Sequence, residues 1–186
     1  MTSKTSHKIK NRKVAKDVFI TPVELAIKHI EFTAMFGRFS QGIPEGKMTW
    51  YDPFKNTGNY YNNFPETQMG YFSTEYNKDW AEILEGRDFF EYEPDTDNLI
   101  ICSNPPYSMM DKIYKRCIEL KAKCISLLVA FHSITPRRIE YMEQAGYKIT
   151  GIHICKVFEW YGMSAMVVFT KTEDAGLLSY DRKVWR

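Results

Sequence analysis

The pattern of hydrophobic and polar positions along the chain predicts strands and helices in alternation. The strongest prediction is a strand at Cys124–Phe131, because this nearly continuous apolar run is typical of strands that are covered on both faces. Further apolar runs predict strands at 48–51, 69–74, 99–102, 147–157 and 165–171. Helical spacing predicts helices at 21–36, 80–84, 109–120 and 136–145. This order favours an α/β fold with a doubly wound, mostly parallel sheet that ends in an antiparallel hairpin.

The start of the first helix is marked by a Thr-Pro pair. In the helix at 21–36, Thr21 is predicted as the N-cap, Pro22 as the first helical residue and Glu24 as the partner in a capping box. The same Thr-Pro signal opens the helix at 136–145, and a glycine follows its end. The buried face of the first helix should hold the apolar residues that recur at helical spacing, which are Val23, Ala26, Ile27 and Ile30.

Composition places the chain among ordinary globular proteins. Its 186 residues fit one domain, and an apolar fraction of 44% with a charged fraction of 26% is average. No apolar run reaches the roughly 20 residues of a membrane-spanning helix, and no signal peptide is recognisable, so we expect an intracellular protein with no membrane partner. The four cysteines lack the spacing of a metal site or a disulfide framework, and we interpret them as buried thiols: Cys102, Cys117, Cys124 and Cys155.

Positive charge is concentrated at the start of the chain. The net charge is only +2, yet no acid precedes Asp17, whereas this segment carries Lys4, Lys8, Lys10, Arg12, Lys13 and Lys16. Such a basic arm can hold the phosphates of a nucleic acid, and it can equally be a solvated, flexible tail.

Candidate chemistry lies directly after the predicted strands. In doubly wound sheets ligands bind beyond the carboxyl ends of the strands. At these positions the chain carries Asp52, Glu75, Asp88 and Asn104-Pro105-Pro106-Tyr107. The two prolines stiffen the loop and remove two N–H donors, so that its carbonyls can point at a ligand. An amide and a carbonyl can then accept two hydrogen bonds from a flat –NH2 group while Tyr107 stacks on the ring that bears it. The alternative is a proline turn in which Asn104 bonds its own backbone.

The segment Asn104-Pro105-Pro106-Tyr107 resembles the signature of the amino-methyltransferases, which is Asn or Asp, two prolines and an aromatic residue. The resemblance implies a Rossmann-like class I methyltransferase fold, S-adenosylmethionine as the cofactor and these four residues as the catalytic loop. It also implies direct transfer of the methyl group to an amino nitrogen, with no covalent enzyme intermediate and no metal. A base inside a duplex cannot reach such a loop, so the nucleotide would be flipped out or unpaired.

Further segments resemble the adenine-specific branch of this family, in the family's own order. Phe19–Ala26 is similar to the segment before the cofactor loop, where Thr21 would help to hold the methionine end of the cofactor. Glu75 stands where the family places the acid that bonds the ribose hydroxyls. Asp88 and Phe89 stand where an acid and an aromatic residue hold the adenine of the cofactor.

The cofactor loop itself has one departure from the family. Asp52–Gly58 resembles this loop, and the resemblance assigns cofactor binding to Asp52, Pro53, Phe54 and Gly58. The family usually has a glycine where Asn56 stands. Asparagine tolerates left-handed conformations better than most residues but carries a side chain. We therefore expect either weaker cofactor binding or a contact made by Asn56 itself.

The resemblance predicts methylation of the exocyclic amino group of adenine in nucleic acid, with DNA favoured over RNA. Phe158 and Trp160 would form a wall of the base pocket together with Tyr107, or they simply cover the end of the hairpin. Methylation of a glutamine side-chain amide is an alternative, because that chemistry uses the same kind of loop. A non-catalytic subunit of a methyltransferase complex is another, and cytosine offers an amino group of similar geometry.

The expected domain organisation follows from these assignments. A flexible basic arm at 1–16 would precede the methyltransferase domain at 17–171, and 172–186 would form a C-terminal tail. We expect no separate target-recognition domain. Recognition of a target sequence would then depend on the pocket, the arm or a partner subunit.

Overall fold

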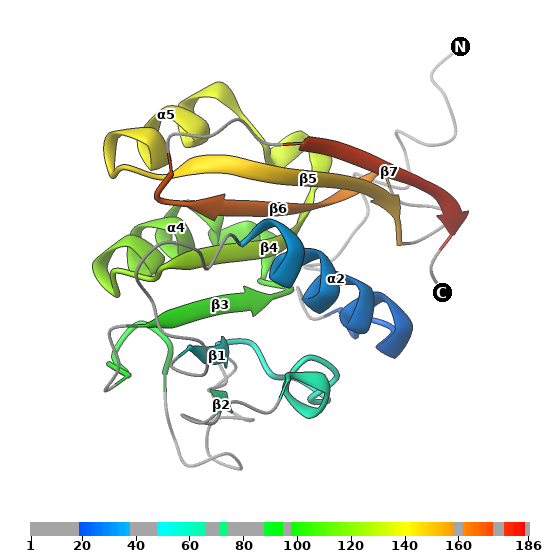
Figure 1. Cartoon of the computed structure of the whole chain (residues 1–186), viewed down its shortest axis with the longest axis horizontal. Helices are drawn as coiled ribbons and strands as arrows, with labels where there is room; N and C mark the ends of the chain where they lie inside the picture. The colour runs from blue at the N-terminus through cyan, green and yellow to red at the C-terminus, as the bar shows by residue number, and fades with distance from the viewer. Residues whose placement is uncertain are drawn as a thin grey trace, which may run out of the picture.

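The computed structural model describes residues 19–37, 48–65, 71–73, 88–94, 98–157, 162–172 and 177–184. Within these ranges seven strands form one sheet in the order β2-β1-β3-β4-β6-β5-β7 (Figure 1). The strands are β1 Thr49–Asp52, β2 Tyr71–Ser73, β3 Leu99–Ser103, β4 Cys124–Ala130, β5 Lys148–Lys156, β6 Ser164–Thr170 and β7 Leu177–Val184. The α-helices of the described residues are α2 Val23–Phe36, α4 Met110–Glu119 and α5 Pro136–Gln144. Short 3-10 helices lie at Tyr61–Asn63, Tyr107–Met109 and Phe131–Ser133.

The directions of the strands confirm the predicted sheet. β2, β1, β3 and β4 pair in parallel, whereas β6 is antiparallel to both β4 and β5. β5 and β6 therefore form the predicted antiparallel hairpin. The carboxyl ends of β1, β3 and β4 meet at one edge of the sheet. Asp52, at the end of β1, and Asn104–Tyr107, directly after β3, were predicted to carry the chemistry.

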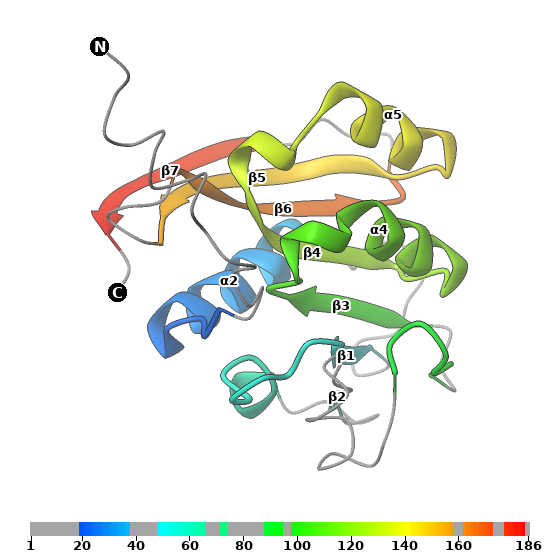
Figure 2. The same ribbon diagram turned by 180° about the vertical axis from the view of Figure 1, so that it is seen from behind.

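Helices cover both faces of the sheet, as the apolar run of β4 predicted. α2 lies on one face, and α4 and α5 lie on the other (Figures 1 and 2). Every residue of β4 is buried. Leu127 belongs to the hydrophobic cluster under α4 and α5, whereas the next residue, Leu128, belongs to the cluster under α2. The four cysteines are buried and free, which confirms their interpretation as buried thiols.

The start of α2 differs from the prediction. The helix begins at Val23, Pro22 occupies the N-cap position, and no side chain caps it, so the expected capping box does not form. Val23 and Ile27 remain 47% and 38% exposed. The buried face holds Leu25, Ala26, His29, Ile30, Phe32 and Thr33. Tertiary contacts explain which face of α2 is buried. His29 and Thr33 form hydrogen bonds with Ser126 of the sheet, so the face that carries them packs against the sheet.

The start of α5, in contrast, is as predicted. The Thr135 side chain accepts a hydrogen bond from the backbone N–H of Arg138, and Pro136 is the first helical residue. Gly146 follows the helix with a φ of +86°, the left-handed conformation expected of a glycine at a helix end.

The last described segment forms a strand where a tail was expected. Leu177–Val184 is β7, which pairs in parallel with β5 and places Leu177 opposite Gly151. The sequence of this segment mixes apolar and charged residues, so it carries no strong strand pattern of its own. No helix in the described part of the chain is both long and apolar enough to cross a membrane.

Candidate active site

Asp52 ties together the ends of two neighbouring strands. It is the last residue of β1, its side chain is fully buried, and its Oδ1 accepts a hydrogen bond of 2.5 Å from the hydroxyl of Ser103 at the end of β3. The same oxygen accepts from the backbone N–H of Phe54 at 3.2 Å. This second bond bends the chain directly after the strand. Asp52 thereby fixes the start of the predicted cofactor loop against β3, the strand that precedes the predicted catalytic loop.

The predicted cofactor loop has a positive φ at Asn56, the position where the resembling family usually has glycine. Asn56 has a φ of +47°, in the left-handed region that asparagine adopts more readily than most residues. Gly58 has a φ of +82°, and its N–H donates to the carbonyl of Lys55 at 2.7 Å. The turn therefore has the shape for which the family uses glycine, and the Asn56 side chain is the feature that distinguishes it.

Three separate segments meet at Thr21. The Asn104 side-chain Nδ2 donates to the hydroxyl oxygen of Thr21 at 3.1 Å and to the carbonyl of Phe19 at 3.4 Å. From the other side, Asn59 Nδ2 donates to the backbone carbonyl of Thr21 at 2.7 Å. Hydrogen bonds thus join the segment before α2, the residue that follows the predicted cofactor loop and the predicted catalytic loop.

The second polar atom of the Asn104 amide is an unused acceptor. Its Oδ1 is buried and has no hydrogen-bond partner among the described residues. The carbonyl of Phe19 can only accept a hydrogen bond, so the amide nitrogen must be the atom that faces it. The oxygen is consequently directed away from the protein's own acceptors. Since buried polar atoms are almost always paired, an oriented oxygen of this kind is suited to a donor on a ligand.

The remainder of the catalytic loop is compact. Pro105 is buried, and Pro106 and Tyr107 are half-buried. The Tyr107 ring lies 6.3 Å from the ring of Phe19, centroid to centroid, with an angle of 33° between the planes. The aromatic ring of the predicted base-stacking residue is therefore adjacent to the segment that also contacts Asn104.

The predicted adenine-binding turn is held by a residue that the sequence analysis missed. Asp88 Oδ1 accepts from the backbone N–H of Phe90 at 2.8 Å, which shapes the turn, and Phe89 is fully buried, 5.3 Å from the ring of Phe54. Arg116 of α4 donates to the carbonyls of Phe89 at 3.2 Å and Tyr92 at 2.9 Å. A single cation beside the apolar stripe of a helix gives no sequence signal for such a role.

Several predicted residues lie outside the described part of the chain. They are Glu75, Phe158 and Trp160, together with all of the basic arm at 1–16. Their assigned roles stay predictions. Among the residues that the structure does describe, no group of three or more His, Cys, Asp or Glu side chains forms a candidate metal site.

A buried polar network that the sequence did not indicate lies beneath this edge. The His29 ring bonds the Tyr60 hydroxyl through Nδ1 and the Ser126 hydroxyl through Nε2, both at 2.8 Å. The Thr33 hydroxyl lies 2.7 Å from the Ser126 hydroxyl and 3.4 Å from the thiol of Cys102. The network links α2, the end of the cofactor loop and two central strands. Burial, with a smaller contribution from the nearby His153, lowers the pKa of His29 to about 3.

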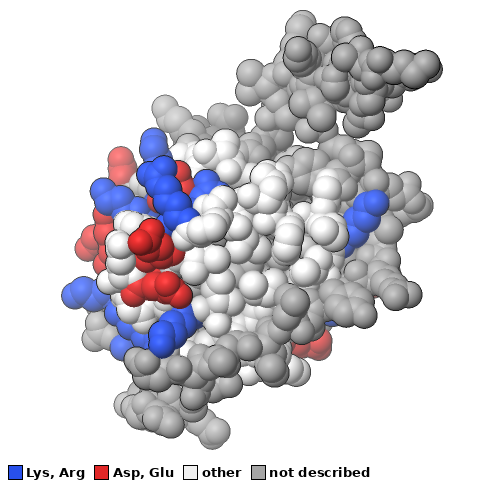
Figure 3. All heavy atoms as spheres, turned by 90° about the horizontal axis from the view of Figure 1, so that it is seen from above, with Lys and Arg blue, Asp and Glu red and all other residues white. Residues whose placement is uncertain are grey.

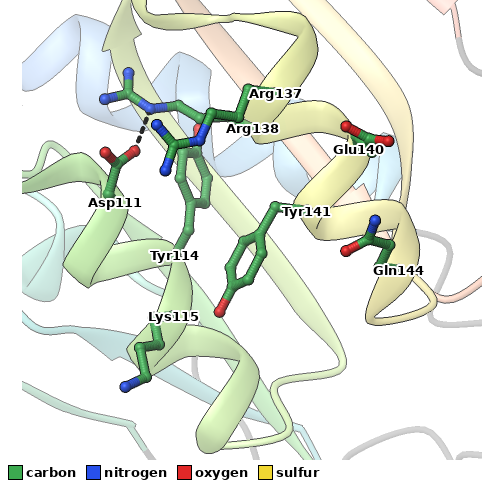
Figure 4. Close-up of a pocket in the computed structure, with 8 residues that line it drawn as sticks. All are labelled: Asp111, Tyr114, Lys115, Arg137, Arg138, Glu140, Tyr141 and Gln144. Carbon is green, nitrogen blue, oxygen red and sulfur yellow. Dashed lines mark hydrogen bonds and ion pairs between the residues drawn. The ribbon is translucent and has the colours of Figure 1, made fainter.

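A pocket of about 350 Å³ lies between α4 and α5, apart from the residues described above (Figure 4). The Arg138 Nε donates to Asp111 at 2.6 Å across its mouth, and this bond lowers the pKa of Asp111. Charges of both signs gather at one end of the neighbouring face (Figure 3). The exposed charged residues of α5 include Arg137, Glu140 and Glu143. This mixture does not give the uniformly basic surface that phosphates require.

Comparison with known proteins gives matches in structure. No protein-family model matches the sequence, and no curated protein does. The type IIG restriction endonuclease BpuSI has a TM-score of 0.57 and 13% identity over 97% of this chain, which spans 28% of that enzyme. A human methyltransferase 10 domain containing protein has a TM-score of 0.55 and 10% identity, covering 91% of this chain and 93% of its own. The METTL16 MTase domain has a TM-score of 0.55 and 13% identity, and the match covers 83% of this chain and 71% of that domain's chain.

At such identities the similarity concerns the fold. The backbone of this chain resembles these structures over most of its length, 91% for the first methyltransferase and 83% for the METTL16 domain. The chain therefore has the Rossmann-like fold of class I methyltransferases.

Proposed function

We propose that this chain transfers a methyl group from S-adenosylmethionine to the exocyclic amino group of adenine in DNA. The observation that carries the proposal is the state of Asn104, whose Nδ2 is held by Thr21 and Phe19 while its buried Oδ1 has no partner among the described residues. An acceptor oriented in this way, at the carboxyl end of a central strand, suits a planar –NH2 group.

The residues present fit the proposed cofactor. The positive φ values of Asn56 and Gly58 give the loop after β1 a tight turn of the kind that the resemblance assigns to the cofactor loop. We assign cofactor binding to Asp52, Pro53, Phe54 and Gly58 in this loop, with Asp88, Phe89 and Glu75 on the adenosine half. When bound, S-adenosylmethionine supplies an electrophilic methyl group. A METTL16 structure contains SAH, which is in keeping with this choice.

The protein's own part in the reaction is to position and desolvate the acceptor. Asn104 Oδ1 and the carbonyl of Pro105 would accept the two amino hydrogens, which fixes the plane of the amino group and draws its lone pair toward the methyl donor. Pro105 and Pro106 keep the loop rigid, so this geometry is set before the base enters. Tyr107 would stack on the base, which offsets part of the cost of unpairing it.

Nucleic acid is the substrate class favoured by the motif resemblance and by two of the structural neighbours. BpuSI is a restriction endonuclease, and one METTL16 structure contains the MAT2A 3'UTR hairpin 1. The Thr-Pro and Asp-Pro-Phe segments resemble the adenine-specific branch of the amino-methyltransferases, which favours a nucleic acid over a protein, and we place DNA before RNA. The basic arm at 1–16 would hold phosphates without reading bases, and a partner subunit would supply long sequence recognition.

The test is a methyl-transfer assay with radiolabelled S-adenosylmethionine and four acceptors of matched concentration. These are single-stranded DNA, the same DNA as a duplex, RNA of the same sequence and a glutamine-containing peptide, with product nucleosides identified by mass spectrometry. We expect N6-methyladenine in DNA, more of it in single strands, and its loss in Asn104→Ala with unchanged S-adenosylmethionine affinity. Methylation of RNA or peptide alone, or of cytosine, would overturn the proposed substrate.

A further inference from the structure

We propose that the segment Phe19–Thr21 is an orienting clamp for Asn104, and that the Thr21 hydroxyl acts as a positioning residue for the catalytic amide. The inference rests on the proposed function, because it concerns how the acceptor oxygen of Asn104 is presented to the substrate. It assigns to Thr21 a role different from cofactor binding.

The need for a clamp follows from the shape of an amide. A rotation of the Asn104 side-chain amide by 180° exchanges Oδ1 and Nδ2, which have nearly the same size. Only one of the two orientations offers an acceptor to an amino group, and the other would present two N–H donors to it. A protein that binds –NH2 through asparagine must therefore hold the amide on its other side.

The carbonyl of Phe19 selects the orientation. It lies 3.4 Å from Asn104 Nδ2, and in the rotated amide it would face Oδ1, so that two acceptor oxygens would oppose each other. The distance is long for a hydrogen bond, which means that this contact alone holds the amide weakly. The shorter bond, 3.1 Å to the Thr21 hydroxyl, supplies the remaining restraint on the amide plane.

Thr21 is itself well fixed for this purpose. The residue is only 6% exposed, and its branched Cβ restricts the rotation that places the hydroxyl. Its backbone carbonyl accepts the 2.7 Å hydrogen bond from Asn59 at the end of the cofactor loop. The hydroxyl is not used to cap α2, although it stands one residue before the N-cap position. These contacts hold the hydroxyl at the catalytic loop and also join the clamp to the cofactor loop.

The test compares Thr21→Val with Thr21→Ser in the full chain. Valine keeps the branch and the volume but removes the oxygen, whereas serine keeps the hydroxyl. We expect Thr21→Val to lower kcat for DNA about 3- to 10-fold, the range for one lost hydrogen bond. Its S-adenosylmethionine Kd and KM for DNA should change less than twofold, and Thr21→Ser should restore most of kcat.

A spectroscopic measurement gives a readout that does not depend on turnover. In ¹⁵N-labelled protein, the two Asn104 side-chain N–H signals, assigned by their absence in Asn104→Ala, should be dispersed and slow to exchange in the wild type. In Thr21→Val they should converge and exchange faster, and in Thr21→Ser they should stay near the wild-type values.

Each result decides the inference. A rise in the S-adenosylmethionine Kd of Thr21→Val that accounts for its activity loss would show that Thr21 acts on the cofactor, and the clamp would be wrong. Unchanged kcat and unchanged Asn104 signals would also overturn it. If the wild type methylates no adenine, the proposed function fails, while the amide signals still test the clamp.

Discussion

Lowering the pH should destabilise this protein through one buried residue, His29. The side chain is fully buried, and its two ring nitrogens bond the Tyr60 and Ser126 hydroxyls at 2.8 Å each. A neutral imidazole satisfies both contacts, because one nitrogen donates and the other accepts. Burial lowers its folded-state pKa to about 3, with a smaller contribution from His153, whereas the ordinary value is 6.5.

The sign and size of the effect follow from these two pKa values. Because the folded pKa is lowered, the unfolded chain binds the proton first, and the stabilising contribution is present above pH 6.5 and is lost as the pH falls toward 3. Each unit below 6.5 removes about 1.4 kcal/mol, since that is the free energy of one pKa unit. Between pH 7 and pH 5 the free energy of unfolding should therefore fall by about 2 kcal/mol from His29 alone.

Urea denaturation at pH 7 and pH 5 measures this change. Other groups also titrate in this interval, so the wild type is compared with His29→Gln, in which the amide retains a donor and an acceptor but no proton is taken up. His132→Gln is the matched control, because His132 is exposed. We expect the pH-dependent loss to be about 2 kcal/mol smaller in His29→Gln and unchanged in His132→Gln. Equal losses in the wild type and His29→Gln would refute the argument.

Two further substitutions probe the site. Arg116→Met should weaken S-adenosylmethionine binding and lower the free energy of unfolding by about 2–3 kcal/mol, because the buried carbonyl of Phe89 and the partly buried carbonyl of Tyr92 lose a charged donor. Calorimetry measures the affinity and urea denaturation the stability, with Lys115→Met on the same helix as the control. Unchanged affinity would contradict the role. Tyr107→Phe should keep most of kcat/KM for DNA. Tyr107→Ala should lower kcat/KM about 10- to 100-fold, because stacking on a base contributes roughly 1–3 kcal/mol. Equal losses in the two variants would show that the hydroxyl, not the ring, is needed.

The sheet and the rigid loop after β3 could be predicted from the sequence because their signals are local. The run Cys124–Ala130 is buried on both faces, as its continuous apolar pattern indicated. The two prolines after β3 mark the end of the strand and the start of a rigid loop in the same few residues. The Asp-Pro-Phe turn is stabilised by a local hydrogen bond, from the backbone N–H of Phe54 to the Asp52 side chain two residues earlier.

The contacts that hold the site together could not be predicted in this way. His29 and Thr33 lie on the buried face of α2 because Ser126, almost a hundred positions later, offers them a partner. Arg116 is buried because the carbonyls of Phe89 and Tyr92 accept from it. Hydrophobic periodicity treats such polar residues as exposed. For this reason it predicted that Val23 and Ile27 belong to the buried face of α2, whereas both are exposed.

The same competition explains the start of α2. A threonine before a proline and a glutamate is a strong N-cap signal, and a side-chain cap typically stabilises a helix by about 1 kcal/mol. The protein forgoes this bond, and the Thr21 hydroxyl accepts from Asn104 instead, 83 residues away in the chain. The preference for a local cap gives way where three segments with predicted functions meet, which is the kind of place where a functional site is expected to override a local rule. Thr21→Val should therefore lower kcat while it leaves the melting temperature nearly unchanged. The reason is that the start of α2, which Thr21 would have capped, already has no side-chain cap.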